Sequence, residues 1–324
     1  MITRTSNIGM QQNSLSQLMS AQNKLFEIQN QAYTQKKVNT LSDNPTEIAT
    51  IMNLNQQLSQ IGSYYSNITK AQEQFDNLDN TFNAVNTKLN RINDLGLQLL
   101  NGTGSAATVS ATKTEIDQLI ESVVDEANAN YNGQYVFSGA KVQKQAYEIQ
   151  RDNNGQITGI IYNGSENGTE GSERQYEISS GVKVATNITG DAVFGYYDAD
   201  AGTGEGLFAS LVQLSQIAGT YGANVAAGTV DDYFAQLETA MGGVESGMEH
   251  VAAVRSDFGS RSSRLTLTKS SLEDLELSTT SHKSSLVDID MVEALSNLVQ
   301  QNYAYQSSMQ VYMATQQNSL LNYL

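Results

Sequence analysis

The chain has no cysteine, no tryptophan and a single proline, Pro45, among its 324 residues. Without cysteine it forms no disulfide and holds no metal or iron–sulfur cluster through thiolates. Average usage would give a chain of this length about 16 prolines. Because proline removes a backbone donor and clashes with the preceding turn of a helix, its near-absence predicts a chain made mostly of uninterrupted helix.

Basic residues are also scarce, since 18 Lys and Arg stand against 34 Asp and Glu and give a net charge of −16. This charge argues against nucleic acid or an anionic membrane surface as a partner. No segment approaches the roughly 18 consecutive apolar residues of a membrane-spanning helix, and the N-terminal segment lacks the apolar core of a Sec-type signal peptide. We therefore expect neither a membrane anchor nor that export route.

Candidate catalytic and metal-binding residues are few. The only histidines are His250 and His282, which are too few for a zinc site in a chain without cysteine. No Ser/His/Asp set, phosphate-binding glycine loop or pair of carboxylates beside an apolar segment is visible. We expect no catalytic residue, no metal and no cofactor, and hence a chain that is not an enzyme.

Pro45 itself marks the start of a helix. Proline is well tolerated at the first helical position, Asn44 before it is a favourable N-cap, and Glu47 stands where a capping-box carboxylate belongs. We therefore assign Asp43, Asn44 and Pro45 to the helix start and to a hinge before it. One helix from there to Leu100 would be about 80 Å long.

Apolar residues alternate at steps of four and three from Tyr64 to Leu99, and a similar series runs from Leu237 to Leu286 with Leu275 among its members. This is the spacing of a coiled-coil seam, and an antiparallel pairing of the two stretches would bury both. A helix between them places Val109, Ile116, Leu119, Val123 and Ala127 on one face. The predicted core residues of this helical rod are Ile68, Phe75, Leu78, Phe82, Val85, Leu89, Ile92, Val251, Val254, Phe258, Leu265 and Leu272.

The two ends of the chain carry sparser apolar stripes among Gln, Asn and Ser. A lone helix with so narrow a stripe is marginal in water, so we expect these ends to be unfolded in the free chain and to order on association. The predicted assembly interface is Ile8, Leu15, Leu18, Leu25, Leu295, Leu298, Val299, Met309, Met313 and Leu320.

Between the helical stretches the period changes to two. Residues 147–149, 157–162 and 176–188 alternate as strands do, and the turn sequence of residues 152–155 is typical of a hairpin. The expected fold is mainly α, a long antiparallel coiled-coil or helical-bundle rod formed by the N- and C-terminal segments, with a small inserted β domain. The expected domains are a terminal helical assembly domain (1–42 and 287–324), a helical rod (43–135 and 206–286) and a β-rich outer domain (136–205).

Several segments resemble one protein family in order and spacing. They are VNTLSDNP at 38–45, NGQYVFSGAK at 132–141, IYNG at 161–164, RQYEI at 174–178, NITGDAVF at 187–194 and DIDM at 288–291. With them the chain resembles, nearly end to end, the flagellin superfamily of bacterial axial proteins, and within it the hook–filament junction proteins. Two departures stand out: Asn44 replaces the second Asp of the family's motif, and Lys36-Lys37 replaces its usual Gly-Lys. Flagellin itself usually has Ala at the position of Pro45, which favours the junction branch.

This resemblance implies a structural adaptor in the extracellular flagellum, exported unfolded by the flagellar type III pathway with a chaperone on its C-terminal helix. Its implied partners are the preceding hook-associated protein, flagellin and copies of itself in a ring. The terminal helices would pack into the axial tube, and the β insert would face outward.

Three alternatives stay open at this point. The chain could be a flagellin, the bulk filament subunit with the same ends. It could be an unrelated soluble coiled-coil binding protein, or a surface enzyme whose site uses the glycine-rich loops at 165–172 and 199–206 of the insert. Neither the number of subunits in a ring nor the surface that faces each partner follows from the sequence.

Overall fold

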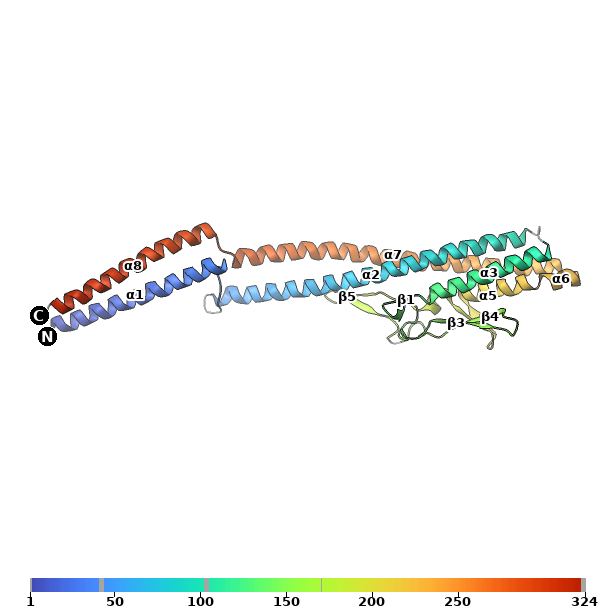
Figure 1. Cartoon of the computed structure of the whole chain (residues 1–324), viewed down its shortest axis with the longest axis horizontal. Coiled ribbons are helices and arrows are strands. Elements are labelled where there is room, and N and C mark those ends of the chain that lie inside the picture. Colours follow the sequence, from blue (N-terminus) through green and yellow to red (C-terminus); the bar gives the residue numbers. More distant parts are fainter. Residues whose placement is uncertain (1, 41–43, 102–104, 170, 322–324) are drawn as a thin grey trace. The chain divides into compact units, whose positions relative to one another are not determined.

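The computed structural model describes residues 2–40, 44–101, 105–169 and 171–321, with side chains described from Gly9 to Gln316. The chain forms two compact units, residues 1–62 with 272–324 and residues 63–271. The helices (Figure 1) are α1 Ile2–Thr34, α2 Pro45–Leu100, α3 Ala106–Ala127, α4 Gly190–Phe194, α5 Gly206–Gly219, α6 Tyr221–Ala227, α7 Val230–Val287 and α8 Met291–Leu321. The strands are β1 Asn130–Tyr131, β2 Gln134–Tyr135, β3 Tyr147–Arg151, β4 Ile157–Tyr162, β5 Gln175–Ser179, β6 Val182–Ala185, β7 Tyr196–Asp198 and β8 Thr203–Glu205. The expected fold class, mainly α with an inserted β region, is confirmed.

The helix start at Pro45 has the expected local chemistry. The Asn44 side-chain oxygen accepts a hydrogen bond from the backbone N–H of Glu47 at 3.2 Å. This cap satisfies one of the donors that the first turn of any helix leaves unpaired. Asp43 lies outside the described residues.

Helices α2 and α7 pair antiparallel in the second unit. The rings of Phe75 and Phe258 meet edge to face, with centroids 5.3 Å apart. One turn further along α2, Asp79 accepts a hydrogen bond from Arg255 Nε at 2.7 Å. Since the residue number rises on α2 as it falls on α7, the two helices run in opposite directions.

The residues proposed for the rod core lie at the centre of these helices, and all are buried except Val254, which is half-buried. Leu275 departs from the expected series, because half of its side chain is exposed. The buried stripe of α7 instead continues every seventh residue, from Leu272 to Thr279. A threonine fits there because its hydroxyl donates to the carbonyl of Leu275 at 2.7 Å, which leaves no polar atom unpaired.

Helix α3 buries a face slightly different from the expected one. Ile120 and Thr112 are buried, whereas Leu119 is half-buried. This face follows the contacts of α3 with α5 and β3. The sequence spacing predicts Leu119 on the buried face instead of Ile120. The two residues are adjacent and both apolar, so spacing alone does not distinguish them.

The β region consists of three antiparallel sheets: the hairpins β1–β2 and β5–β6 and a four-stranded sheet in the order β3-β4-β7-β8. It begins at Asn130 rather than at the expected residue 136. The missed hairpin β1–β2 turns at Asn132 and Gly133, whose φ angles are 51° and 77°. Asn-Gly is the residue pair that this turn requires, so the sequence carried its signal.

The β region is anchored to the helices by rings and by side chains. Tyr147 is fully buried, and its ring lies 4.7 Å from that of Phe208 in α5. Burial raises the pKa of Tyr147 well above its usual range, so its hydroxyl keeps the proton and donates to the Gly195 carbonyl at 3.0 Å. Asn67 of α2 donates to the Glu177 carbonyl in β5 at 2.8 Å. The hairpin β5–β6 therefore has a fixed position on the second unit.

We predict that Phe258→Ala lowers the free energy of unfolding by about 3–5 kcal/mol, because it removes a buried ring at the centre of the α2–α7 contact. The measurement is urea unfolding followed by circular dichroism. Leu267→Ala on the same helix is the control, since Leu267 is 73% exposed and its truncation should change stability by less than about 0.5 kcal/mol. Equal effects of the two substitutions would contradict this packing.

Candidate functional site

The terminal helices α1 and α8 lie side by side and antiparallel in the first unit (Figure 1). Gln301 of α8 donates from Nε2 to the Ala21 carbonyl of α1 at 3.3 Å, so the two helices approach closely. The residues that face the partner helix recur at steps of three and four, and we call them the inner seam. The inner seam comprises Gln11, Ser14, Leu18, Ala21, Leu25, Ile28 and Ala32 on α1, and Ala294, Leu298, Gln301, Tyr305, Ser308, Tyr312 and Thr315 on α8.

The inner seam is incompletely buried. Five of its fourteen members are Gln, Ser or Thr, three are Ala and six are Leu, Ile or Tyr, and among them only Ala294 is buried. Small residues allow the close approach, but they remove little apolar surface from water. Because hydrophobic stabilisation scales with the apolar area buried, this pair contributes much less per turn than the α2–α7 core.

A second series of large apolar residues stays exposed on both helices, and we call it the outer seam. Apart from Val292, which lies three residues before Leu295, its positions follow those of the inner seam by one residue, so its spacing is also that of a heptad. The outer seam comprises Leu15, Met19, Phe26 and Tyr33 on α1, at 37–89% exposure, and Val292, Leu295, Val299, Met309 and Met313 on α8, at 40–80% exposure. A helix with two adjacent seams can pack against two neighbours, and the α1–α8 pair uses one seam on each helix.

The residues predicted for the assembly interface divide between these two surfaces. Leu18, Leu25 and Leu298 belong to the inner seam, whereas Leu15, Leu295, Val299, Met309 and Met313 belong to the outer seam. Ile8 and Leu320 lie outside the residues whose side chains are described. The sequence interpretation missed Ile28 on the inner seam and Met19 and Phe26 on the outer seam. Counting heptad steps through the intervening Gln and Ser would have found them.

The two chain crossings between the helical pairs are hydrogen-bonded to each other. The Lys37 N–H donates to the Val287 carbonyl at 2.7 Å, and the Ile289 N–H donates to the Gln35 carbonyl at 3.3 Å. These bonds flank an antiparallel bridge between Lys36 and Asp288. We call this short bridge the clasp. It holds the end of α1 against the start of α8.

The motif at 288–291 has a local role beside the clasp. The Asp290 carboxylate accepts hydrogen bonds from the backbone N–H groups of Val292 at 2.8 Å and Glu293 at 3.3 Å. It thus caps the N-terminus of α8, where a negative charge is also favoured by the helix dipole. On the other crossing, α1 ends before Gln35, which takes a left-handed φ of 58°. Such a residue commonly ends a helix.

Neither a cluster of metal ligands nor a membrane-spanning helix is found among the described residues. Within the described residues no group of three or more His, Cys, Asp and Glu side chains could hold a metal ion. His250 contacts the Ala192 carbonyl at 2.8 Å through Nε2, and His282 is exposed. No helix in the described part of the chain is long and apolar enough to cross a membrane.

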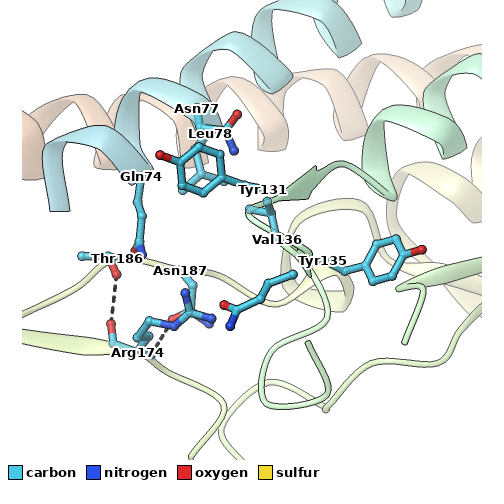
Figure 2. A pocket seen from close by; sticks show the side chains of 10 residues that line it. Gln74, Asn77, Leu78, Tyr131, Tyr135, Val136, Arg174, Thr186 and Asn187 are labelled. Atoms are coloured by element: carbon cyan, nitrogen blue, oxygen red, sulfur yellow. Dashed lines mark hydrogen bonds between the residues drawn. The ribbon is translucent and has the colours of Figure 1, made fainter. Parts of the chain in front are cut away.

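A small notch lies where α2 meets the base of the β5–β6 hairpin and the β1–β2 hairpin (Figure 2). Its hollow measures about 30 Å³, which admits a group the size of one or two water molecules but no drug-sized or nucleotide-sized ligand. Two larger hollows, of about 440 and 770 Å³, border Asp191 on the β region. Ser210 and His250 both line the first of them, but their side chains hydrogen-bond to the backbone carbonyls of Gly206 and Ala192 and not to each other.

Comparison with known proteins gives two family matches and full-length relatives. The bacterial flagellin N-terminal helical region matches residues 5–142, and the bacterial flagellin C-terminal helical region matches residues 241–324. The curated protein flagellar hook-associated protein 3 of Salmonella typhimurium is 24% identical over 318 residues, 96% of each chain. The protein of the same name from Escherichia coli is 25% identical over 320 residues, again 96% of each chain.

Solved structures show the same fold. The FlgL structure from Xanthomonas campestris has a TM-score of 0.59 at 14% identity and covers 71% of this chain and 99% of its own. The flagellar hook associated protein-3 of Legionella pneumophila also has a TM-score of 0.59, at 15% identity, and covers 73% of this chain and 98% of its own. The two family matches together span about two thirds of the sequence and include both paired terminal helices. The chain belongs to the flagellin family.

Proposed function

We propose that this chain is a structural adaptor subunit of the bacterial flagellum that joins the hook-associated region to the flagellin filament. The observation that carries the proposal is the outer seam: both terminal helices keep a heptad of large apolar residues exposed after pairing with each other. Contiguous exposed apolar surface of this kind marks an interface with another protein. The two curated relatives, each called flagellar hook-associated protein 3 and aligned over 96% of its length, support the place of that interface in the flagellum.

Assembly would proceed by burial of the outer seam against neighbouring subunits. A fully buried large apolar side chain contributes about 1.5–3 kcal/mol relative to an exposed one, and these side chains are roughly half exposed, so each contributes on the order of 1 kcal/mol. Nine such residues per subunit, on two helices, supply enough to offset part of the cost of association. The terminal helices thereby pack into the axial tube.

We also propose that the terminal helices, which pair with each other in the structure, become fully ordered only on assembly, and the weak inner seam supports this. The α1–α8 pair buries one residue of its inner seam and leaves the nine large apolar side chains of the outer seam exposed. Such a pair gains most of its stability from neighbours, as in coupled folding and binding. A chain whose ends are easily unfolded also suits export through the flagellar type III pathway. A chaperone would cover the apolar stripe of α8 before export.

The partners in this proposal are the preceding hook-associated protein on one side, flagellin on the other and copies of the chain in a ring. The negative charge of −16 speaks against nucleic acid and anionic membrane as partners. A role as the bulk filament subunit is the alternative within the family, because the matching family regions are those of flagellin. Family membership argues against the unrelated coiled-coil binder, and the structural roles of the relatives argue against an enzyme.

We predict that the purified chain forms a short cap of fixed length on isolated hooks that carry the preceding hook-associated protein, and that flagellin extends this cap. Electron microscopy of the mixture measures the cap. Short flagellin filament seeds, incubated with the chain alone, are the control and should not elongate. Long new filaments on those seeds would assign the chain to the filament. If the chain neither caps the hooks nor elongates the seeds, the proposed flagellar role is overturned.

The outer seam yields a sharper test in Val299→Asp. The substitution places a charge on a side chain that is 55% exposed in the free chain and should be buried after assembly. We expect the variant to keep the circular dichroism and urea stability of the second unit but to lose incorporation into caps by at least about tenfold, since burying an unpaired carboxylate costs several kcal/mol.

Two variants on the same helix complete this experiment. Asn297→Asp adds the same charge at an exposed position outside both seams, and it should incorporate normally. Leu298→Asp disrupts the inner seam and should both block incorporation and loosen the α1–α8 pair, as measured by protease cleavage of the termini. Normal incorporation of Val299→Asp would refute the outer seam as the assembly surface.

A further inference from the structure

Arg174 occupies an unusual position among the arginines of this acidic chain. Four others form ion pairs with carboxylates: Arg91 with Glu115, Arg151 with Glu121, Arg255 with Asp79 and Arg261 with Asp257. Arg174 is half-buried, yet no carboxylate of the described residues pairs with its guanidinium. A half-buried cation that lacks a counter-charge loses part of its hydration without compensation. It is therefore receptive to an anion from outside the chain.

The backbone of Arg174 is held firmly at the base of the β5–β6 hairpin (Figure 2). Its carbonyl accepts from the Thr186 N–H at 2.9 Å and from the Thr186 hydroxyl at 3.3 Å. Its N–H donates to Asn187, whose side-chain N–H₂ in turn donates to the Ser172 carbonyl at 2.8 Å. These bonds fix the point from which the side chain extends.

The notch around Arg174 contains donors and no carboxylate. Its lining includes the carboxamides of Gln74, Asn77 and Gln134 and the phenol of Tyr131. Within the part of the chain that the structure describes, the side chains of Asn77 and Gln134 make no hydrogen bond. One cation with uncommitted amide donors, in a chain with almost twice as many acidic as basic residues, is a site selective for an anion. The hollow of about 30 Å³ has the size of two oxygen atoms.

We propose that this notch binds a carboxylate, and that its occupant in the assembled flagellum is an Asp or Glu side chain of a second copy of the chain. The guanidinium fork matches the two oxygens of a carboxylate in bidentate geometry. Copies that each carry a charge of −16 repel one another unless fixed cations meet carboxylates at their contact. The choice of occupant rests on the proposed function, because it requires copies that lie side by side. The proposal that the notch binds a carboxylate does not rest on the proposed function.

The first experiment tests the notch in the free chain. Sodium acetate is titrated into the ¹⁵N-labelled protein, and the Nε–Hε signals of the arginines are followed by NMR against sodium chloride at the same ionic strength. We expect a saturable shift for Arg174 with acetate and none with chloride. Arg264, which is exposed and also without an ion pair among the described residues, is the internal control. Equal responses of Arg174 and Arg264 would overturn the site.

The second experiment tests the occupant. Arg174→Gln removes the charge and leaves a shorter, uncharged amide side chain, and Arg264→Gln is the matched control. On hooks that carry the preceding hook-associated protein, we expect Arg174→Gln to need about tenfold more protein for half-complete caps, with Arg264→Gln unchanged. Sodium acetate should weaken the capping by the unsubstituted chain more than sodium chloride does. For Arg174→Gln the two salts should have the same effect on capping.

The two experiments fail separately. If acetate shifts Arg174 but both variants cap alike, the second copy is excluded as the occupant. If the unsubstituted chain forms no caps at all, the proposed function fails, and the acetate titration still decides whether the notch binds a carboxylate. Urea unfolding of Arg174→Gln checks that the β5–β6 hairpin and its base remain folded. If Arg174→Gln lowers the free energy of unfolding enough to account for its weaker capping, Arg174 has a purely structural role and the proposal is overturned.

Discussion

A helix with two adjacent apolar seams cannot bury both of them against a single partner helix. The terminal helices of this chain face that constraint, because α1 and α8 pack mainly against each other within the first unit. They use for their own pairing the seam that contains alanines and polar residues among its Leu, Ile and Tyr side chains, and they leave the apolar outer seam exposed. The free chain thus keeps its best packing surface for neighbours, and its weakest helical pair is the part that assembly would complete.

The second unit is built in the opposite way, with its apolar residues used internally. A run of touching rings leads from Phe75 on α2 through Phe258 on α7 and Phe82 to Phe137, and then to Phe194 and Phe208. Ring contacts of this kind add to the burial of each residue. The helical core and the β region therefore share one aromatic core.

The fold followed from the sequence where the chemistry is local and periodic. Heptads predicted the long helices, Pro45 with Asn44 predicted the start of α2, and alternation predicted β3 to β6. Errors arose where two apolar residues stand next to each other, as at Leu119 and Ile120, because spacing alone cannot decide which one faces the core. For the same reason, Leu298 and Val299 were predicted to lie in one interface, whereas the structure places Leu298 on the inner seam and Val299 on the outer seam. The position of Arg174 beside carboxamides from α2 and β2 depends on long-range packing, to which no sequence pattern points.

The clasp has a mechanical consequence. The crossing from α1 to α2 and the crossing from α7 to α8 are joined by two backbone hydrogen bonds at one level of the chain. Backbone bonds do not depend on side-chain identity, so the joint tolerates substitution at Lys36 and Lys37. A pulling force on one terminal helix is shared by both strands of the crossing instead of stretching one linker alone. The clasp therefore couples the two crossings, so that a load on either terminal helix reaches both of them.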